Sequence, residues 1–197
     1  MAFTQRSEKT RTAILTAARQ LLASRGYEAT TIRAVAAAAG IDPSMVMRYY
    51  GNKEGLFAAA VDVDLRLPDA SALPPEEVGN VLAHHVIARW EGDLSDEFIS
   101  LLLRSAGTNR AAAEQFRSIF EQQLLSFVEG LTGRGSQARR RAAMVSSQVL
   151  GVAYCRYILE LPAMVELDGE TLANTLGPVL QHYLTGDLGA ARPAAEN

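Results

Sequence analysis

The sequence predicts an all-α fold, with an N-terminal three-helix head that contains a helix-turn-helix and a C-terminal helical bundle as the body, about nine helices in all. Three observations lead to this prediction. Apolar residues recur at three- and four-residue steps through most of the 197 residues. Gly, Pro and capping residues interrupt this pattern where helices would begin and end. No convincing β-rich segment with the alternation of polar and apolar residues that marks a half-buried strand is found.

The first two helices are separated by clear stop and start signals. A long amphipathic helix is predicted over residues 8–25, because Gly26 follows its last apolar position. Thr30 is a good N-cap for a short alanine-rich helix over residues 31–39. Gly40 ends that helix, and we expect a positive φ there and too little space for a side chain.

Asp42 and Pro43 form the next start signal, because Asp caps free amides and Pro fits the first helical position. A third helix is therefore predicted over residues 43–50, and Gly51-Asn52 separates it from a fourth over 53–65. The body helices are expected at 75–90, 95–107, 110–131, 136–160 and 169–184. The domain division that follows is 1–56 for the helix-turn-helix head, 57–74 for a connecting helix and linker, 75–187 for the body, and 188–197 for a disordered tail.

Composition indicates a globular protein of the cytoplasm. Hydrophobic residues make up 48% and charged residues 21% of the chain, which is enough apolar surface for a core. Cys155 is the only cysteine, so no intramolecular disulfide is possible, and no CxxC or Cys/His cluster offers a zinc framework. We expect no metal and no cofactor. The chain shows neither a signal peptide nor an apolar run long enough to span a membrane, so no membrane partner is expected.

Charge is distributed unevenly along the chain. Residues 1–56 contain eight basic and four acidic side chains, a net charge of +4, whereas the whole chain has a net charge of −3 and the remainder therefore −7. A basic head on an acidic body is typical of a DNA-binding unit attached to a unit with another role. The two short helices around Gly40, with a longer helix before them, fit a head that inserts its third helix into the major groove of double-stranded DNA.

Residues 11–57, RTAILTAARQLLASRGYEATTIRAVAAAAGIDPSMVMRYYGNKEGLF, resemble the tetracycline-repressor (TetR) family without a gap. The resemblance implies that the DNA contacts are made by Thr31, Arg33, Pro43, Ser44, Met45, Met47, Tyr49 and Lys53. It also implies that Tyr50 closes the core of the head. The family usually has tyrosine where Met47 stands here, so the phosphate hydrogen bond of that tyrosine is lost. Arg48 either replaces this contact or points away from DNA.

The rest of the chain resembles the ligand-binding and dimerisation body of the same family. The resemblance implies that the last two long helices pack against a second copy as a four-helix bundle, through the apolar residues Val149, Val152, Ala153, Leu172, Leu176, Val179, Leu180 and Tyr183. A ligand pocket is expected from the large side chains Trp90, Phe98, Leu102, Phe116, Phe120, Phe127, Met144 and Tyr154. The alternative for each of these is an ordinary core position.

Other candidate sites are weaker. His84 and His85 are adjacent, so their side chains point about 100° apart on a helix and cannot chelate one ion together. Arg139, Arg140 and Arg141 form either a nucleic-acid patch or a solvated helix start. No paired base and nucleophile, metal triad or phosphate loop is present, so we expect no enzymatic activity.

The functional hypothesis is a homodimeric repressor that a small, largely apolar effector releases from a palindromic operator. The alternatives are a transcriptional activator or a ligand-independent repressor of the same fold, or an all-α enzyme.

Overall fold

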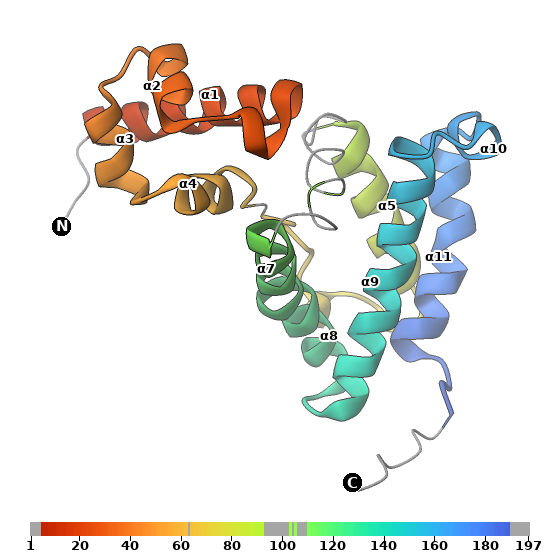
Figure 1. The fold of residues 1–197 in the computed structure, drawn as a ribbon. Helices are drawn as coiled ribbons and strands as arrows, with labels where there is room; N and C mark the ends of the chain where they lie inside the picture. Colours follow the sequence, from red (N-terminus) through yellow and green to blue (C-terminus); the bar gives the residue numbers. More distant parts are fainter. Residues whose placement is uncertain (1–4, 63, 93–102, 104, 106–109, 190–197) are drawn as a thin grey trace, which may run out of the picture.

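The computed structural model describes residues 5–62, 64–92, 103, 105 and 110–189, and every regular element within them is a helix. The all-α prediction is confirmed. Figure 1 shows the first four helices grouped at one end of the molecule and the later helices packed together as a body.

The head contains α1 (Gln5–Ala29), α2 (Ile32–Ala39), α3 (Pro43–Tyr50) and α4 (Lys53–Ala60). Helical geometry in α1 is broken at Gly26, whose φ is 75° and ψ is 175°. The N-cap of α2 is Thr31 and not the expected Thr30, because Thr30 is buried and its hydroxyl donates to the Gly26 carbonyl at 2.8 Å.

The body begins with a short 3-10 turn, η1 (Ala70–Ala72), and the helix α5 (Val78–Glu91). Three further segments run without a break: α7 (Arg110–Ile119), the π-helical turn η2 (Phe120–Leu124) and α8 (Leu125–Thr132). The chain then forms α9 (Ser136–Tyr157), the single turn α10 (Pro162–Val165) and α11 (Gly169–Thr185).

Four expectations need correction or fall outside the structure. The fourth helix ends at Ala60 and not at Leu65, because Arg19 takes the Ala60 carbonyl at 2.8 Å and the following backbone is bound by body side chains. The predicted helix over 110–131 contains a π turn, and Pro162 begins a helical turn between the helices expected at 136–160 and 169–184, where none was predicted. The helix expected over 95–107 lies almost wholly outside the described residues.

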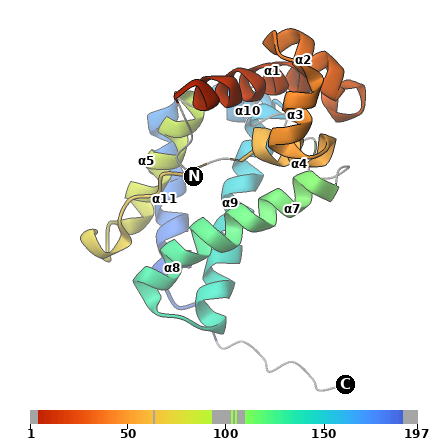
Figure 2. The same cartoon turned by 90° about the vertical axis from the view of Figure 1, so that its left-hand side faces the viewer.

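Two hydrophobic clusters form the core. One joins α5, α8, α9 and α11. The other joins the four head helices and also takes in Ala112 and Ile119 of α7. Figure 2 shows α7 running directly below α4. The head therefore rests on α7 through apolar side chains.

Helices α5 and α11 pack closely along their length. Gly79 and Gly177 lie at the crossing, where a Cβ would meet Gln181 or Asn80, and the Gly79 amide donates to the Gln181 side chain at 2.7 Å. This contact buries Leu176 and its neighbours on α11 within the protomer. Among the residues that the structure describes, no helix is long and apolar enough to cross a membrane.

Candidate DNA-binding surface and cavity

Helices α2 and α3 are separated by a turn of three residues whose geometry follows from local chemistry. Gly40 adopts the left-handed conformation, with φ 66° and ψ 34°, and its amide donates to the Ala37 carbonyl at 3.2 Å. The Asp42 carboxylate accepts the Ser44 amide at 2.8 Å and caps α3. Hydrogen bonds from the side chain and then the backbone of Ser44 lower the pKa of Asp42, so the cap is ionised at neutral pH.

The outer surface of α3 is open. Val46 is fully buried below it, whereas Pro43, Ser44 and Arg48 are exposed and Met47 is 46% exposed. Met45 is half-buried. The exposed side chains start at the first residue of α3, as insertion of a helix N-terminus into a groove requires.

The other head residues expected at DNA flank this surface. Thr31 and Arg33 are exposed at the start of α2, and the Thr31 hydroxyl accepts the Ala34 amide at 3.1 Å. Tyr49 is half-buried, with its hydroxyl 3.1 Å from the Ser7 hydroxyl. Tyr50 packs against the head core, as the resemblance implied.

Lys53 is held by its own chain. Its ammonium donates to the Glu28 carbonyl at 3.1 Å and lies 4.3 Å from the centre of the Tyr27 ring. Tyr27 in turn donates to Glu54 at 3.2 Å. A phosphate at Lys53 would therefore share the ammonium with these partners.

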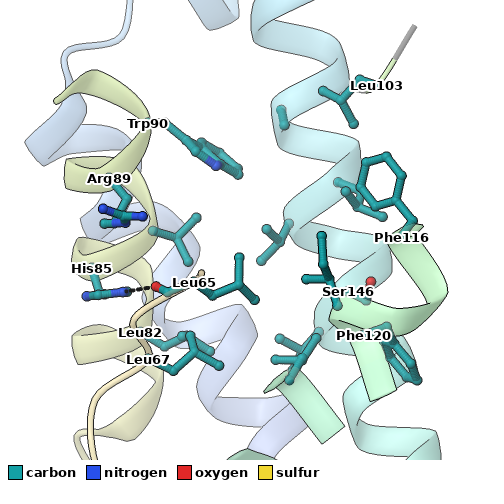
Figure 3. A pocket seen from close by; sticks show the side chains of 17 residues that line it. Leu65, Leu67, Leu82, His85, Arg89, Trp90, Leu103, Phe116, Phe120 and Ser146 are labelled. Carbon is teal, nitrogen blue, oxygen red and sulfur yellow. Dashed lines mark hydrogen bonds between the residues drawn. The ribbon is translucent and has the colours of Figure 1, made fainter. Parts of the chain in front are cut away.

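A cavity of about 140 Å³ lies where α5, α7, η2 and α9 meet the linker that follows α4. Figure 3 shows the side chains around it. Most of them are apolar, and the wall consists of Leu65, Leu67, Leu82, His85, Val86, Arg89, Trp90, Leu103, Phe116, Ile119, Phe120, Leu124, Val145, Ser146, Val149, Leu150 and Ala153.

The linker at this cavity is fixed by three body side chains. The Leu65 amide donates to Gln123 at 2.7 Å, and the Leu65 carbonyl lies 2.9 Å from His85 Nε2 (Figure 3). Because a carbonyl only accepts, His85 carries a proton on Nε2. Arg89 donates to the Asp64 carbonyl at 2.8 Å. We call Gln123, His85 and Arg89 the linker clamp.

The structure brings only part of the expected pocket together. Trp90, Phe116 and Phe120 line the cavity. Phe127 is buried in the body core away from it, and Met144 and Tyr154 are 37% and 43% exposed on α9. The cavity-facing stripe of α9 is instead Val145, Val149 and Ala153, at steps of four. Phe98 and Leu102 lie outside the described residues.

The apolar stripes expected at a dimer interface are largely covered by the protomer itself. Leu172, Leu176 and Leu180 are at most 3% exposed, against α5 and the rest of the body core. Val152 is also buried, Val179 and Tyr183 are half-buried, and Val149 and Ala153 line the cavity. One protomer therefore covers most of these residues by itself, and their place at a dimer interface stays a prediction.

Two family models match the chain. One, described as the tetracyclin repressor-like C-terminal domain, matches residues 76–184, more than half of the chain. The other, described as bacterial regulatory proteins of the tetR family, matches residues 14–60. The chain belongs to the TetR family. It is a DNA-binding transcriptional regulator, as the resemblance of residues 11–57 implied.

Individual proteins resemble the chain over most of its length. The uncharacterised helix-turn-helix regulator YdeS of Bacillus subtilis is 29% identical over 138 residues, 67% of either chain. A TetR-family regulator from Streptomyces coelicolor is 28% identical with a TM-score of 0.66, over 94% of this chain and 99% of that one. NalD of Pseudomonas aeruginosa, at 24% identity and a TM-score of 0.70 over 92% and 98%, shares the fold.

Sequence reasoning missed the linker clamp of this TetR-family regulator. His85 was considered only as a metal ligand, and neither Gln123 nor Arg89 was singled out. The described residues contain no group of three His, Cys, Asp or Glu side chains that could hold a metal ion. No local signal marks these residues, because each lies 20 or more positions from the linker residue that it binds.

Proposed function

We propose that this TetR-family regulator is a homodimeric repressor whose two heads bind successive major grooves of a palindromic operator, about 34 to 36 Å apart. A small, largely apolar effector enters the cavity of each body and lowers operator affinity. For such release the effector must bind the DNA-binding conformation of the protein less tightly than the released one. The coupling free energy between effector binding and operator binding is typically about 1 to 3 kcal/mol.

The observation that carries the proposal is a wall shared between cavity and head. Leu65, Phe116 and Ile119 line the cavity and also belong to, or pack against, the hydrophobic cluster of the head. Packed side chains cannot deform continuously. A molecule that displaces this wall therefore also displaces the side chains on which the head packs.

Val61 caps the end of α4, and the Asp64 carbonyl, which accepts from Arg89, is the first backbone group that the linker clamp binds. Only residues 62 and 63 lie between them. The linker clamp therefore offers a second connection from the cavity to the head, since both His85 and Arg89 stand in the cavity wall.

The DNA contacts are proposed on α2, α3 and the start of α4. Exposed Arg33 is suited to a guanine edge and Ser44 and Thr31 to phosphate or base edges. The proposed DNA-binding surface is completed by the first residues of α3, by its exposed Met47 and Arg48, and by Tyr49. Lys53 would add a phosphate contact beside its bond to the Glu28 carbonyl.

The homodimer is proposed on the outward surfaces of α9 and α11. Exposed Met144 and Tyr154 give α9 an apolar surface that a second copy would cover. The same fold is found in NalD, described as a repressor of a multidrug efflux pump, and in SmeT, known in complex with triclosan.

A gel shift with DNA that flanks the protein's own gene tests the proposal, with light scattering on the same sample. We expect a dimer that retards this DNA and is released by a small apolar compound. A monomer in light scattering would contradict the proposed dimer. A gel shift that no compound affects would contradict the proposed effector. Activation of a reporter by the bound protein would favour the activator.

A further inference from the structure

We propose that the cavity takes an uncharged molecule with one aromatic ring and one hydroxyl group, of the size of phenol, and that Ser146 on α9 binds the hydroxyl. That this molecule is the effector rests on the proposed function. Its binding does not, because it can be measured without DNA.

The volume of the cavity suits a ligand with a single ring. It is about 140 Å³, close to an engineered apolar cavity of about 150 Å³ in another protein that takes up benzene.

Aromatic side chains stand on opposite walls. Trp90 extends from α5, and Phe116 and Phe120 come from the α7 and η2 side (Figure 3). Aromatic rings attract one another in edge-to-face and offset-stacked arrangements, so such walls favour a ring over an alkyl chain of equal volume.

Three polar side chains interrupt this apolar wall, and two of them serve the linker. His85 and Arg89 donate to the carbonyls of Leu65 and Asp64. No Asp or Glu belongs to the described wall. The described wall therefore offers no partner to a cation, and an anion would compete with the linker carbonyls for His85 and Arg89. A neutral ligand can enter without burying a charge and without disturbing these bonds.

Ser146 is the third polar residue of the wall. Its hydroxyl has no hydrogen-bond partner in the part of the chain that the structure describes, whereas that of the adjacent Ser147 donates to the Met144 carbonyl at 2.8 Å. A hydroxyl at an apolar cavity favours a ligand with one matching polar group.

Fluorescence of Trp90, the chain's only tryptophan, reports binding directly. Phenol, toluene, benzoate and octanoate are the probes, and calorimetry checks the result. We expect phenol to bind most tightly. Ser146→Ala should weaken phenol about three- to tenfold, the loss of one hydrogen bond, and leave toluene unchanged. Ser147→Ala is the matched control and should change neither.

A second pair of variants tests the location. Val149→Phe places a ring in the cavity and should abolish binding of phenol and toluene, whereas Val165→Phe, at an exposed position on α10, should not. Circular dichroism confirms that each variant is folded.

Tighter binding of benzoate would show that an anion is recognised, and tighter binding of octanoate that an alkyl chain is; either overturns the proposal. So does a Ser146→Ala variant that binds phenol as the original does, or the absence of binding by all four probes. Such failures leave operator binding by the protein without ligand untouched, so they are distinct from a failure of the proposed function.

Discussion

Arg33 and Lys53 are both cations of the head, but their surroundings differ. Arg33 is exposed in the first turn of α2, whereas the Lys53 ammonium already contacts the Glu28 carbonyl and the Tyr27 ring. An arginine can form a bidentate pair with guanine, and an ammonium at a helix N-terminus favours phosphate. We therefore expect Arg33 to contribute to sequence discrimination and Lys53 to general affinity.

Alanine variants separate these two roles. Arg33→Ala should cost roughly 1 to 3 kcal/mol on the cognate site and much less on random DNA. Lys53→Ala should weaken all DNA alike and reduce the slope of log affinity against log salt by about one. Fluorescence anisotropy over a salt series measures both. Equal losses on both DNAs for Arg33→Ala, with an unchanged slope for Lys53→Ala, would refute the assignment.

Gly40 is constrained by its backbone and not by its neighbours. Its φ is 66°, yet a Cβ built there would meet nothing within 4 Å. The expected lack of space is thus wrong, and only the positive φ remains as a reason for glycine.

Gly40→Ala should therefore lower the free energy of unfolding by about 1 to 2 kcal/mol, the cost of a left-handed conformation for an L-residue. Gly40→Asn should lose less, because Asn tolerates this region. Chemical denaturation measures the difference. Equal stability of the Ala variant would mean that the turn adopts another conformation.

At the scale of elements, α11 depends on two arginines of α9. Arg141, only 7% exposed, donates to the carbonyls of Tyr183 and Gly186, both at 2.8 Å. Arg140 donates to those of Leu188 and Gly189, the first two residues of the expected tail. These carbonyls at and beyond the end of α11 lack helical partners, so the arginines satisfy them.

Arg141→Ala should destabilise the body by about 2 to 3 kcal/mol, because it removes charge-assisted hydrogen bonds from a buried helix end. Arg139→Ala, at an exposed neighbour, is the control and should stay within about 0.5 kcal/mol. Urea unfolding followed by circular dichroism compares them. A normal midpoint for Arg141→Ala would show that water replaces the arginine.

Elements with local signals could be predicted from the sequence, and elements set by tertiary contacts could not. The bounds of α3 follow from Asp42, Pro43 and Gly51, all within reach of the helix itself. The end of α4 depends on Arg19, forty-one residues earlier in the chain. The cavity residues on α9 could not be predicted for a similar reason. Periodicity shows that a helix has an apolar surface, but it does not show which element or cavity that surface faces.

At the scale of the whole molecule, the buried surface of α11 separates folding from dimerisation. Leu176 lies in the body core of one protomer, while Tyr154 on α9 is 43% exposed. Leu176→Asp should therefore prevent folding of the body, and Tyr154→Asp should yield folded protein with a weakened dimer and weaker operator binding. Circular dichroism and light scattering distinguish these results. A folded Leu176→Asp monomer would instead support the prediction that Leu176 lies at the dimer interface.

Communication between body and head gives the last prediction. Gln123 lies in the π turn η2 and accepts the Leu65 amide, so it joins the α7 side of the cavity to the linker after α4. π turns occur frequently at functional sites. If the linker clamp transmits occupancy of the cavity, the loss of one clamp residue should reduce the coupling between effector and DNA more than the binding of either.

Gln123→Leu should therefore bind operator DNA and the releasing compound with nearly the original affinities, but the compound should release DNA less effectively. Gln122→Leu, an exposed position in the same turn, is the matched control. Titrations of DNA with and without compound, and of compound with and without DNA, must give one coupling factor, because linkage is reciprocal. Unchanged coupling in Gln123→Leu would leave the shared wall of Leu65, Phe116 and Ile119 as the route to the head.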